Sequence, residues 1–380
     1  MAIRDTPSEA NPADATWLLR LDSVGDGPRV AVKDCIDVAG TPTTVGCRAI
    51  AEDAVPALAD APVVDSARRQ GARIVGKTNL VELCRHADGV NTWTGTPENP
   101  LDPARIPGGS SSGSAVAVAR GEADVGYGTD TGGSVRVPAA CCGIVGLKTS
   151  TGRISTHGVF EFSRTLDTVG VLTRDVGTAG LGMQLMEPGF SAALNIDCTT
   201  VGRLRIPDVD PTVDAAVDAA LASAGLSTVD VHIPEWRGWI TAANDLMSAE
   251  GFLAHRFLLD RADRLEERHA RGIEDGGKVR AQRVVACRRV ALSATDRLRR
   301  LLEEHPTLAL PTLAMQPPRL GESARTTYLT VPFNLAGLPA LALPVPRDDG
   351  GLPASLQLVG GPFEEERLLA VGVEVEAAVT

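Results

Sequence analysis

The sequence predicts an α/β fold in which one domain spans residues 1–380. Two helical patterns are each followed by a short apolar strand, at 63–70 with 73–75 and at 211–224 with 228–232, and this alternation is typical of α/β folds. Apolar residues make up 43% of the chain, which is enough for a sizeable core. Neither a break in composition nor a low-complexity linker divides the chain, so we expect a single domain.

The first predicted strand covers residues 29–38, RVAVKDCIDV, where apolar and polar residues alternate. The sequence Gly40-Thr41-Pro42 is typical of a turn and ends this strand. Lys33 is therefore expected in the middle of a strand or at its end.

The helix predicted at 211–224 has marked ends. Asp210 is a favourable N-cap, Pro211 suits the first helical position, and Gly225 ends the helix before the next strand.

A helical layer is predicted from about 239 to 305, because apolar residues recur there every three or four positions. Only Gly272 and Gly276-Gly277 interrupt this pattern. Beyond it, three strands and a closing helix are expected at 308–313, 340–345, 354–359 and 364–378.

Charge and cysteine content exclude several classes of protein. The formal net charge is −11 and no basic block offsets it, so we expect no nucleic-acid partner. No run approaches the length of a membrane span, so we expect no membrane partner either. The seven cysteines lack CxxC spacing and the chain start has no apolar signal core. We therefore expect a cytoplasmic protein with structural cysteines, no metal site and a small-molecule partner.

Small residues are densest at 107–150, the core of the predicted site. Two Gly/Ser clusters, 108–114 and 129–134, are joined by an Ala/Val-rich segment and an apolar run around Val125. Ordering glycine costs conformational entropy, so these clusters indicate positive φ or a close approach of the backbone to a ligand. A flexible linker is the alternative. The apolar run and the ending CCGIVGLK disfavour it.

One generic motif in this stretch contains a candidate nucleophile. Residues 109–113 fit G-x-S-x-G, which would make Ser111 the nucleophile if an acid and then a histidine followed. The candidate histidines lie in polar or helical surroundings with no other mark: His232, His255, His269 and His305. This alternative stays open but is disfavoured.

Phosphate and dinucleotide motifs are also disfavoured. Gly126, Gly128 and Gly132 have the spacing GxGxxxG, which differs from the dinucleotide fingerprint, and Pro138 opposes the helix that should follow. Neither Gly/Ser cluster is followed by Lys and Ser/Thr, as a Walker loop requires. No cofactor is expected.

The chain has only four lysines, Lys33, Lys77, Lys148 and Lys278, against 33 arginines. A desolvated lysine can give up its proton near neutral pH, whereas arginine cannot. Lysines in such a chain are therefore candidates for roles that need a neutral amine, although each can also be a surface or structural ammonium.

The sequence resembles the amidase signature family. The segments PGGSSSGSAVAVA, GTDTGGSVRVPAACCGIVGLK and VKDCIDVAG carry the resemblance. It extends, in the family's order, through GKTNLVEL, TPENP, LDTVG, LALPTLA, PFNLAGLPALALP and LQLVGGPFEEERLL. Within the family the chain is most similar in appearance to plant and bacterial indole-3-acetamide hydrolase-like amidases.

The resemblance implies a Ser-Ser-Lys triad, with Ser134 as the nucleophile, Ser110 as the bridging serine and Lys33 as the base. It also implies a cis peptide bond at Gly109-Ser110. A serine hydroxyl becomes a good nucleophile when a base takes its proton, and lysine acts as a base when burial or neighbouring groups lower its pKa.

Further roles follow from the same resemblance. The backbone N–H groups of Thr131, Gly132, Gly133 and Ser134 would form the oxyanion hole. Asp130 and Arg136 would fix the nucleophile loop as an ion pair, and Ser111 would orient the proton relay. The alternative for Ser111, Ser112 and Ser114 is plain capping of the following helix.

The implied fold is a single domain with a large central mixed β-sheet covered by α-helices. The implied activity is hydrolysis of a small carboxylic amide through a serine acyl-enzyme, and a homodimer is compatible with it. Two alternatives are a glutamine-hydrolysing A subunit of a tRNA-dependent amidotransferase and a non-catalytic scaffold. Trp93, Phe160 and Phe162 are candidate pocket residues, and the helix over 239–258 is a candidate wall.

Overall fold

A large mixed β-sheet forms the centre of the molecule. The computed structural model describes residues 15–192 and 198–380, and in them one sheet has eleven strands in the order β1-β3-β2-β4-β6-β5-β10-β11-β9-β7-β8. The strands are β1 (Trp17–Arg20), β2 (Arg29–Lys33), β3 (Arg73–Thr78), β4 (Val125–Asp130), β5 (Val145–Lys148), β6 (Thr168–Thr173), β7 (Thr200–Leu204), β8 (Ser227–Val231), β9 (Leu308–Pro311), β10 (Ala340–Val345) and β11 (Ala354–Val359). β2 runs parallel to β3 and β4, β7 runs parallel to β8 and β9, and the other neighbours are antiparallel.

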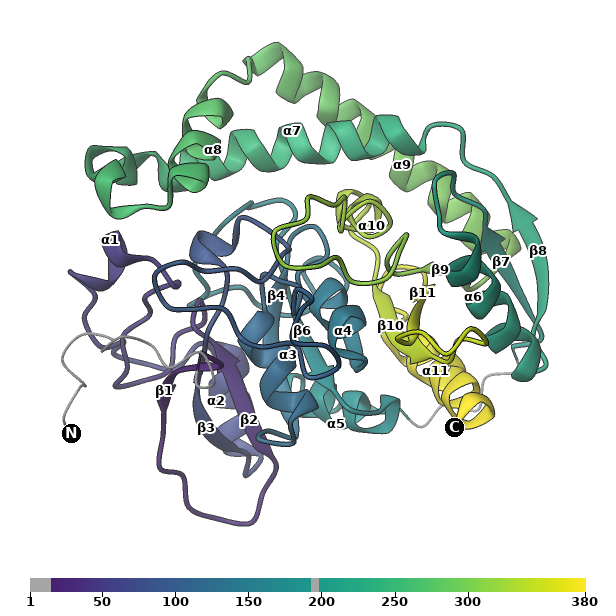
Figure 1. The fold of residues 1–380 in the computed structure, drawn as a ribbon, viewed down its shortest axis with the longest axis horizontal. Helices are drawn as coiled ribbons and strands as arrows, with labels where there is room; N and C mark the ends of the chain where they lie inside the picture. The colour runs from purple at the N-terminus through teal and green to yellow at the C-terminus, as the bar shows by residue number, and fades with distance from the viewer. Residues whose placement is uncertain (1–14, 193–197) are drawn as a thin grey trace.

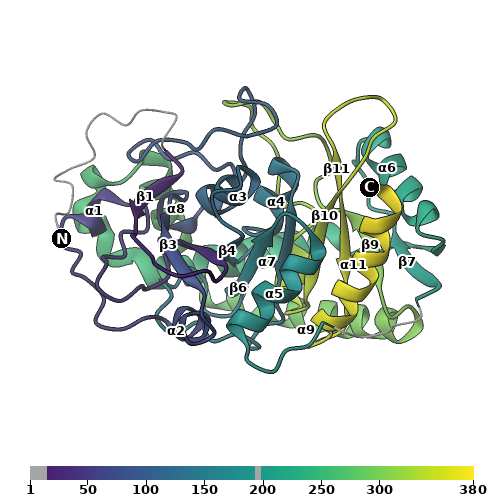
Figure 2. The same cartoon turned by 90° about the horizontal axis from the view of Figure 1, so that it is seen from below.

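Helices cover both faces of this sheet (Figures 1 and 2). The helices are α1 (Arg48–Ala51), α2 (Pro62–Arg69), α3 (Ser112–Ala119), α4 (Arg136–Cys142), α5 (Val176–Met186), α6 (Pro211–Ser223), α7 (Trp236–His255), α8 (Glu267–Gly277), α9 (Ala281–Glu304), α10 (Val331–Leu335) and α11 (Glu365–Val379), with 3₁₀ segments at Glu82–Cys84 and Arg256–Arg264. One face carries α2, α5, α6 and α11, and the other carries α3 and α4. The predicted α/β fold with a mixed sheet is confirmed.

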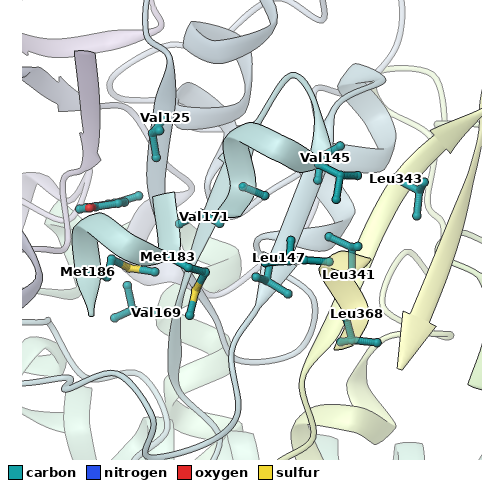
Figure 3. Close-up of a cluster of buried hydrophobic side chains, with 14 of the residues drawn as sticks. Val125, Val145, Leu147, Val169, Val171, Met183, Met186, Leu341, Leu343 and Leu368 are labelled. Carbon is teal, nitrogen blue, oxygen red and sulfur yellow. The ribbon is translucent and has the colours of Figure 1, made fainter. Parts of the chain in front are cut away.

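The main core lies between the sheet and the helices α5 and α11. Met183 of α5 and Leu368 of α11 pack there against strand residues such as Leu147, Val171 and Leu341 (Figure 3). All five side chains are almost fully buried. Burying a side chain of this kind contributes about 1.5–3 kcal/mol, so this layer gives the sheet a rigid base for the loops at its edge.

Most predicted elements have their expected places. Asp210 caps α6 by accepting the Thr212 N–H at 2.8 Å, and Gly225 ends the helix with φ +71°. The C-terminal strands and helix also lie where the sequence predicts them.

The first predicted strand is shorter than expected, because β2 ends at Lys33 and does not continue to Val38. The Ile36 N–H donates to the Lys33 carbonyl at 3.0 Å and closes a turn. The Asp34 carboxylate accepts the Thr44 N–H at 3.0 Å, which fixes that turn. Lys33 consequently lies at the carboxyl end of a strand.

The helical layer predicted at 239–305 is interrupted, but not at the glycines where the sequence predicts the interruptions. Gly272, Gly276 and Gly277 lie inside α8, and the breaks fall in the 3₁₀ segment before α8 and at 278–280 after it. Gly276 serves helix packing, because a Cβ there would lie 2.2 Å from the Ser248 carbonyl oxygen of α7. Glycine thus lets α7 and α8 approach closely.

All seven cysteines are free, and all but Cys198 are buried. Across residues 15–192 and 198–380, we find no helix with both the length and the apolar character needed to cross a bilayer.

Gly276→Ala should lower the free energy of unfolding by about 1–3 kcal/mol, since an added methyl group would overlap backbone and push the two helices apart. Gly238→Ala is the matched control: it lies in α7 with open space around it and should leave stability unchanged or raise it by about 0.5–1 kcal/mol. Urea unfolding of both variants measures this. Equal stability of the two variants would contradict the packing role of Gly276.

Candidate active site

Lys33 lies at the carboxyl end of β2, beside the end of the parallel strand β4. It is fully buried, and its Nζ donates to Ser110 Oγ and to Thr129 Oγ1, both at 2.7 Å. The carboxyl ends of parallel strands meet at one edge of a sheet, which explains why Lys33 meets Thr129. The amine is therefore held by neutral hydroxyl groups.

The other lysines have different surroundings. Lys77 of β3 is also fully buried, but its Nζ pairs with the Asp34 carboxylate at 2.8 Å. Lys148 donates to the carbonyls of Thr149 and Leu338, and burial lowers the pKa of Lys148 to about 7. Among the four lysines, Lys33 is the one whose amine contacts a serine hydroxyl.

Ser110 stands between Lys33 and the second Gly/Ser cluster. The Gly109-Ser110 peptide bond is cis, as the resemblance implied. The Ser110 carbonyl accepts the Val81 N–H at 3.1 Å, and the Gly109 N–H donates to the Ala87 carbonyl at 2.9 Å. Backbone contacts on both sides thus fix the position of the Ser110 hydroxyl.

Ser134 lies in the loop that joins β4 to α4. It exposes 7% of its surface, whereas Ser110 and Lys33 expose none. The Ser111 N–H donates to the Ser134 carbonyl at 3.3 Å and ties the two clusters together. Ser134 is therefore the more accessible serine of this pair.

A buried ion pair organises residues 131–135, named the nucleophile loop because the resemblance assigns the nucleophile to Ser134. Arg136 donates from Nε to Asp130 Oδ2 at 3.0 Å and from a terminal nitrogen to Asp130 Oδ1 at 2.9 Å. The same carboxylate accepts the N–H groups of Gly133 at 2.7 Å and Val135 at 3.1 Å. Burial opposes ionisation of this carboxyl, but the Arg136 guanidinium outweighs burial and holds the pKa of Asp130 well below its ordinary range.

The loop leaves three backbone donors for an oxyanion. The Gly133 N–H is engaged by Asp130, so in this conformation it is not among the donors that the resemblance implied. Within residues 15–192 and 198–380, the N–H groups of Thr131, Gly132 and Ser134 have no protein acceptor. These groups can bind a developing negative charge.

Two residues from a distant segment hold this loop. Thr330 donates from Oγ1 to the Gly132 carbonyl at 2.6 Å, and a Cβ on Gly133 would lie 2.3 Å from the same hydroxyl oxygen. Asn334 of α10 donates to Asp130 Oδ1 at 2.7 Å and accepts from Arg136 at 2.6 Å. Sequence reasoning missed these contacts, although Asn334 lies in the family-like segment PFNLAGLPALALP.

Asp167 is a further residue that sequence reasoning did not single out, although LDTVG contains it. Its Oδ1 accepts from Thr131 Oγ1 at 2.5 Å, and its Oδ2 accepts the N–H groups of Phe162 and Ser163 at 2.8 and 3.0 Å. Burial raises the pKa of Asp167 to about 7. The aromatic segment around Phe162 is thereby connected to the nucleophile loop.

Two other serines of the first cluster are bonded to β4. Ser111 is fully buried and donates to the Thr129 carbonyl at 3.3 Å, and Ser114 donates to the Tyr127 carbonyl at 3.1 Å. Ser111 is the N-cap of α3 but makes no capping hydrogen bond through its side chain. The capping alternative is therefore wrong for Ser111, because its hydroxyl is bonded to β4.

Aromatic side chains from the predicted pocket segments gather beside α7. Phe160 and Phe162 stack against His255 with ring centroids 5.2 and 5.8 Å apart. Met247 of α7 lies over the nucleophile loop, since a Cβ on Gly132 would be 3.3 Å from the Met247 methyl group. α7 thus faces the nucleophile loop.

One group of side chains has metal-ligand chemistry. Glu82, Glu266 and His269 each place one ligand atom within 4.8 Å of the others. The carboxylates already have protein donors, because Glu82 accepts the Glu266 N–H and Glu266 accepts from Arg268 Nε, both at 2.9 Å. We assign no ion to this group.

The sheet, the buried Lys33-Ser110 contact and the Ser134 loop are together typical of a hydrolase with an α/β fold. Comparison with known proteins identifies the family. The model of the family described as "Amidase" matches residues 26–191 and 190–369. The chain belongs to the amidase signature family, whose members are hydrolases acting on carbon-nitrogen bonds.

Individual relatives cover nearly the whole chain. The A subunit of a glutamyl-tRNA(Gln) amidotransferase from Synechococcus sp. (strain RCC307) is 33% identical over 93% of this chain and 83% of its own length. A 2-amino-5-chloromuconic acid deaminase of Comamonas testosteroni is 34% identical over 93% and 82%. A crystal structure of an amidase superposes with a TM-score of 0.84 at 31% identity, covering 93% of this chain and 85% of the other.

Asp130→Asn should lower the free energy of unfolding by about 3–5 kcal/mol, because it leaves the Arg136 charge buried without its partner. Arg271→Gln, which breaks an exposed ion pair with Glu267, should cost less than about 1 kcal/mol. Denaturant unfolding of both variants at pH 7 measures the difference, and a loss below about 1 kcal/mol for Asp130→Asn would contradict the role of the ion pair.

The effect of Asp130→Asn should also depend on pH. The pKa of Asp130 is lower in the folded chain than the value of about 3.9 in an unfolded chain. Its stabilising contribution is therefore fully present above that pH and is lost as the pH falls below it. The stability difference between the parent chain and the variant should shrink below about pH 4, and a difference that grew there would contradict the assignment.

Proposed function

We propose that this chain hydrolyses a small carboxylic amide to a carboxylate and ammonia through an acyl-enzyme on Ser134. The observation that carries the proposal is the fully buried Lys33 amine, 2.7 Å from Ser110 Oγ and held by hydroxyl groups. Lys77 is also fully buried, but its amine forms an ion pair with the Asp34 carboxylate at 2.8 Å and contacts no serine hydroxyl.

In the proposed first step, Ser134 Oγ attacks the amide carbonyl carbon and forms a tetrahedral intermediate. The Ser134 proton passes to Ser110 Oγ while the Ser110 proton passes to the neutral Lys33 amine. The carbonyl oxygen gains the negative charge, which the N–H groups of Thr131, Gly132 and Ser134 stabilise. Each such donor contributes about 3 kcal/mol to transition-state stabilisation.

The proton then returns along the same path to the leaving nitrogen, the C–N bond breaks and ammonia departs. In the second half of the reaction, water attacks the acyl carbon and gives one proton through Ser110 to Lys33. The bond between the acyl carbon and Ser134 Oγ then breaks, and the proton returns through Ser110 to Ser134 Oγ. The released carboxylic acid ionises at neutral pH. Ser110 is a relay in both halves and ends each cycle with the proton count it began with.

The alternative, a glutamine-hydrolysing subunit, is favoured by one observation: the relatives at 33–34% identity include glutamyl-tRNA(Gln) amidotransferase A subunits. The deaminase of the same identity indicates that members this similar act on different carbon-nitrogen bonds. The filled positions 33, 110 and 134 oppose a non-catalytic scaffold.

For substrate size we start from a small primary amide. Met247 lies beside the proposed site and supplies apolar surface that fits the hydrocarbon part of an acyl group. An aryl amide such as indole-3-acetamide belongs in the panel for that reason, and because of the likeness to indole-3-acetamide hydrolase-like amidases.

Lys33→Met should lower kcat by about 10²- to 10⁴-fold, because no other amine among the described residues contacts Ser110. Lys278→Met is the control, since Lys278 is exposed, pairs with Asp275 and should leave kcat unchanged. Steady-state ammonia release from one amide across pH 5–9 measures both. A Lys33→Met variant with full activity would exclude the relay.

Ser134→Ala should abolish ammonia release and block labelling by a fluorophosphonate, because both need the Ser134 hydroxyl as the nucleophile. Ser111→Ala should keep labelling, since the Ser111 hydroxyl is bonded to the Thr129 carbonyl. Loss of labelling in Ser111→Ala alone, with labelling kept in Ser134→Ala, would instead support the G-x-S-x-G alternative.

The purified chain should release ammonia from simple amides without any partner. A panel of primary amides graded by acyl size, with glutamine included, measures this by an ammonia assay. Turnover of glutamine alone, and only after further subunits are added, would favour the amidotransferase alternative.

A further inference from the structure

Arg85 is a largely buried cation that has no ion-pair partner among residues 15–192 and 198–380. Its one side-chain hydrogen-bond partner in these residues is His255 Nδ1 at 3.5 Å. Burial lowers the pKa of the Arg85 guanidinium to about 10, so it stays charged at pH 7. The fully buried arginines among the described residues, Arg136 and Arg203, each hold a carboxylate.

The surroundings of Arg85 are built to hold a guanidinium. It lies over the Phe162 ring, with its central carbon 5.3 Å from the ring centroid. Two glycines leave space for it, because a Cβ on Gly251 of α7 or on Gly272 of α8 would lie 3.1 Å from one of its terminal nitrogens. The Phe162 segment, α7 and α8 thus enclose the guanidinium group of Arg85. None of these three segments places a carboxylate in an ion pair with it.

The contact with His255 does not neutralise this charge. His255 Nε2 lies 2.9 Å from the Glu161 carbonyl, so this nitrogen carries the proton and Nδ1 presents its lone pair to Arg85. Burial lowers the pKa of His255 to about 4, so the ring is neutral at pH 7. A guanidinium has five N–H donors, and a single neutral acceptor leaves most of them unpaired.

Two chains of contact place Arg85 beside the proposed catalytic site. The Arg85 guanidinium lies over the ring of Phe162, and the Phe162 N–H donates to the Asp167 carboxylate. The other oxygen of that carboxylate accepts a hydrogen bond from Thr131 of the nucleophile loop. Independently, Gly251 lies one turn of α7 after Met247, which covers Gly132. Four helical residues rise about 6 Å, so the contacts of Met247 and of Gly251 lie one turn apart along α7.

The turn before Arg85 is bonded to the bridging serine, Ser110. Arg85 directly follows the turn at 81–84, whose Val81 N–H donates to the Ser110 carbonyl at 3.1 Å and whose Cys84 N–H donates to the Val81 carbonyl at 2.9 Å. Arg85 is also partly exposed.

We propose that Arg85 binds a carboxylate on the acyl part of the substrate, so that the preferred substrates are monoamides of dicarboxylic acids. A planar guanidinium fork binds a carboxylate through two parallel hydrogen bonds, and the pair is strongest where water is excluded. This inference rests on the proposed amidase function and narrows it, because a neutral aryl amide would leave the Arg85 charge unpaired.

The test compares carboxylate-bearing amides with neutral amides of similar length. In the parent chain, succinamate and glutaramate should have higher kcat/KM than valeramide and hexanamide. Arg85→Met should lower kcat/KM for the two acidic amides by about 30- to 1,000-fold, mainly through KM, and leave the neutral amides within about threefold. Arg85→Lys keeps the positive charge but loses the planar guanidinium. Its kcat/KM for the acidic amides should fall between those of the parent chain and Arg85→Met.

Arg85→Met should also fold, because it replaces an unpaired buried charge with an apolar side chain of similar length. Thermal unfolding checks this. Equal loss for acidic and neutral amides, or no loss for either, would overturn the inference while leaving the amidase function standing.

A binding measurement separates failure of this inference from failure of the proposed function. Calorimetry should detect glutaramate binding to Ser134→Ala, and at least about 30-fold weaker binding to the double variant with Arg85→Met. If no amide is hydrolysed but this binding depends on Arg85, the proposed reaction fails and the carboxylate site stands. Equal glutaramate affinity in both variants would overturn the carboxylate site.

Discussion

The buried ion pair between Asp130 and Arg136 is the interaction on which the rest of the site depends. The carboxylate takes up two backbone N–H groups of the nucleophile loop, and the guanidinium reaches Asn334, the Thr330 carbonyl and Gln357 of β11. The loop is therefore fixed to the sheet and to α10 at once. Removing either charge would leave the other buried and unpaired, which costs far more than an exposed ion pair contributes. The orientation of the backbone donors in the loop follows from this anchor.

The sheet supplies the second constraint, because it brings together residues about a hundred positions apart. β2 and β4 run parallel, so Lys33 and the Ser134 loop emerge at the same edge. Ser110 arrives from the segment before α3, where backbone contacts to Val81 and Ala87 hold it. α7 then closes this edge and carries Met247 over the loop. The rigid core beneath α5 and α11 makes these placements reproducible (Figure 3).

Sequence reasoning predicted the α/β alternation, the ends of α6 and the C-terminal strands, since local signals such as Asp210 and Gly225 determine them. It overextended the first strand, because the Asp34 contact that ends β2 comes from a loop. The triad positions came from the resemblance, whereas Asn334 approaches the site only through tertiary folding. Arg85 carried no local signal at all. The proposed role of Arg85 rests on its lack of a carboxylate partner among the described residues. The sequence alone does not show which side chains form ion pairs.

The central claim is that Ser134 carries the acyl group and that Lys33 drives its formation. Acid quenching during turnover of an activated ester, followed by trypsin digestion and mass spectrometry, tests it directly. Cleavage after Arg105, Arg120 and Arg136 separates Ser110 and Ser111, in peptide 106–120, from Ser134, in peptide 121–136. We expect the acyl mass on peptide 121–136 in the parent chain and its loss in Lys33→Met. Acyl mass on peptide 106–120 instead would contradict the assignment.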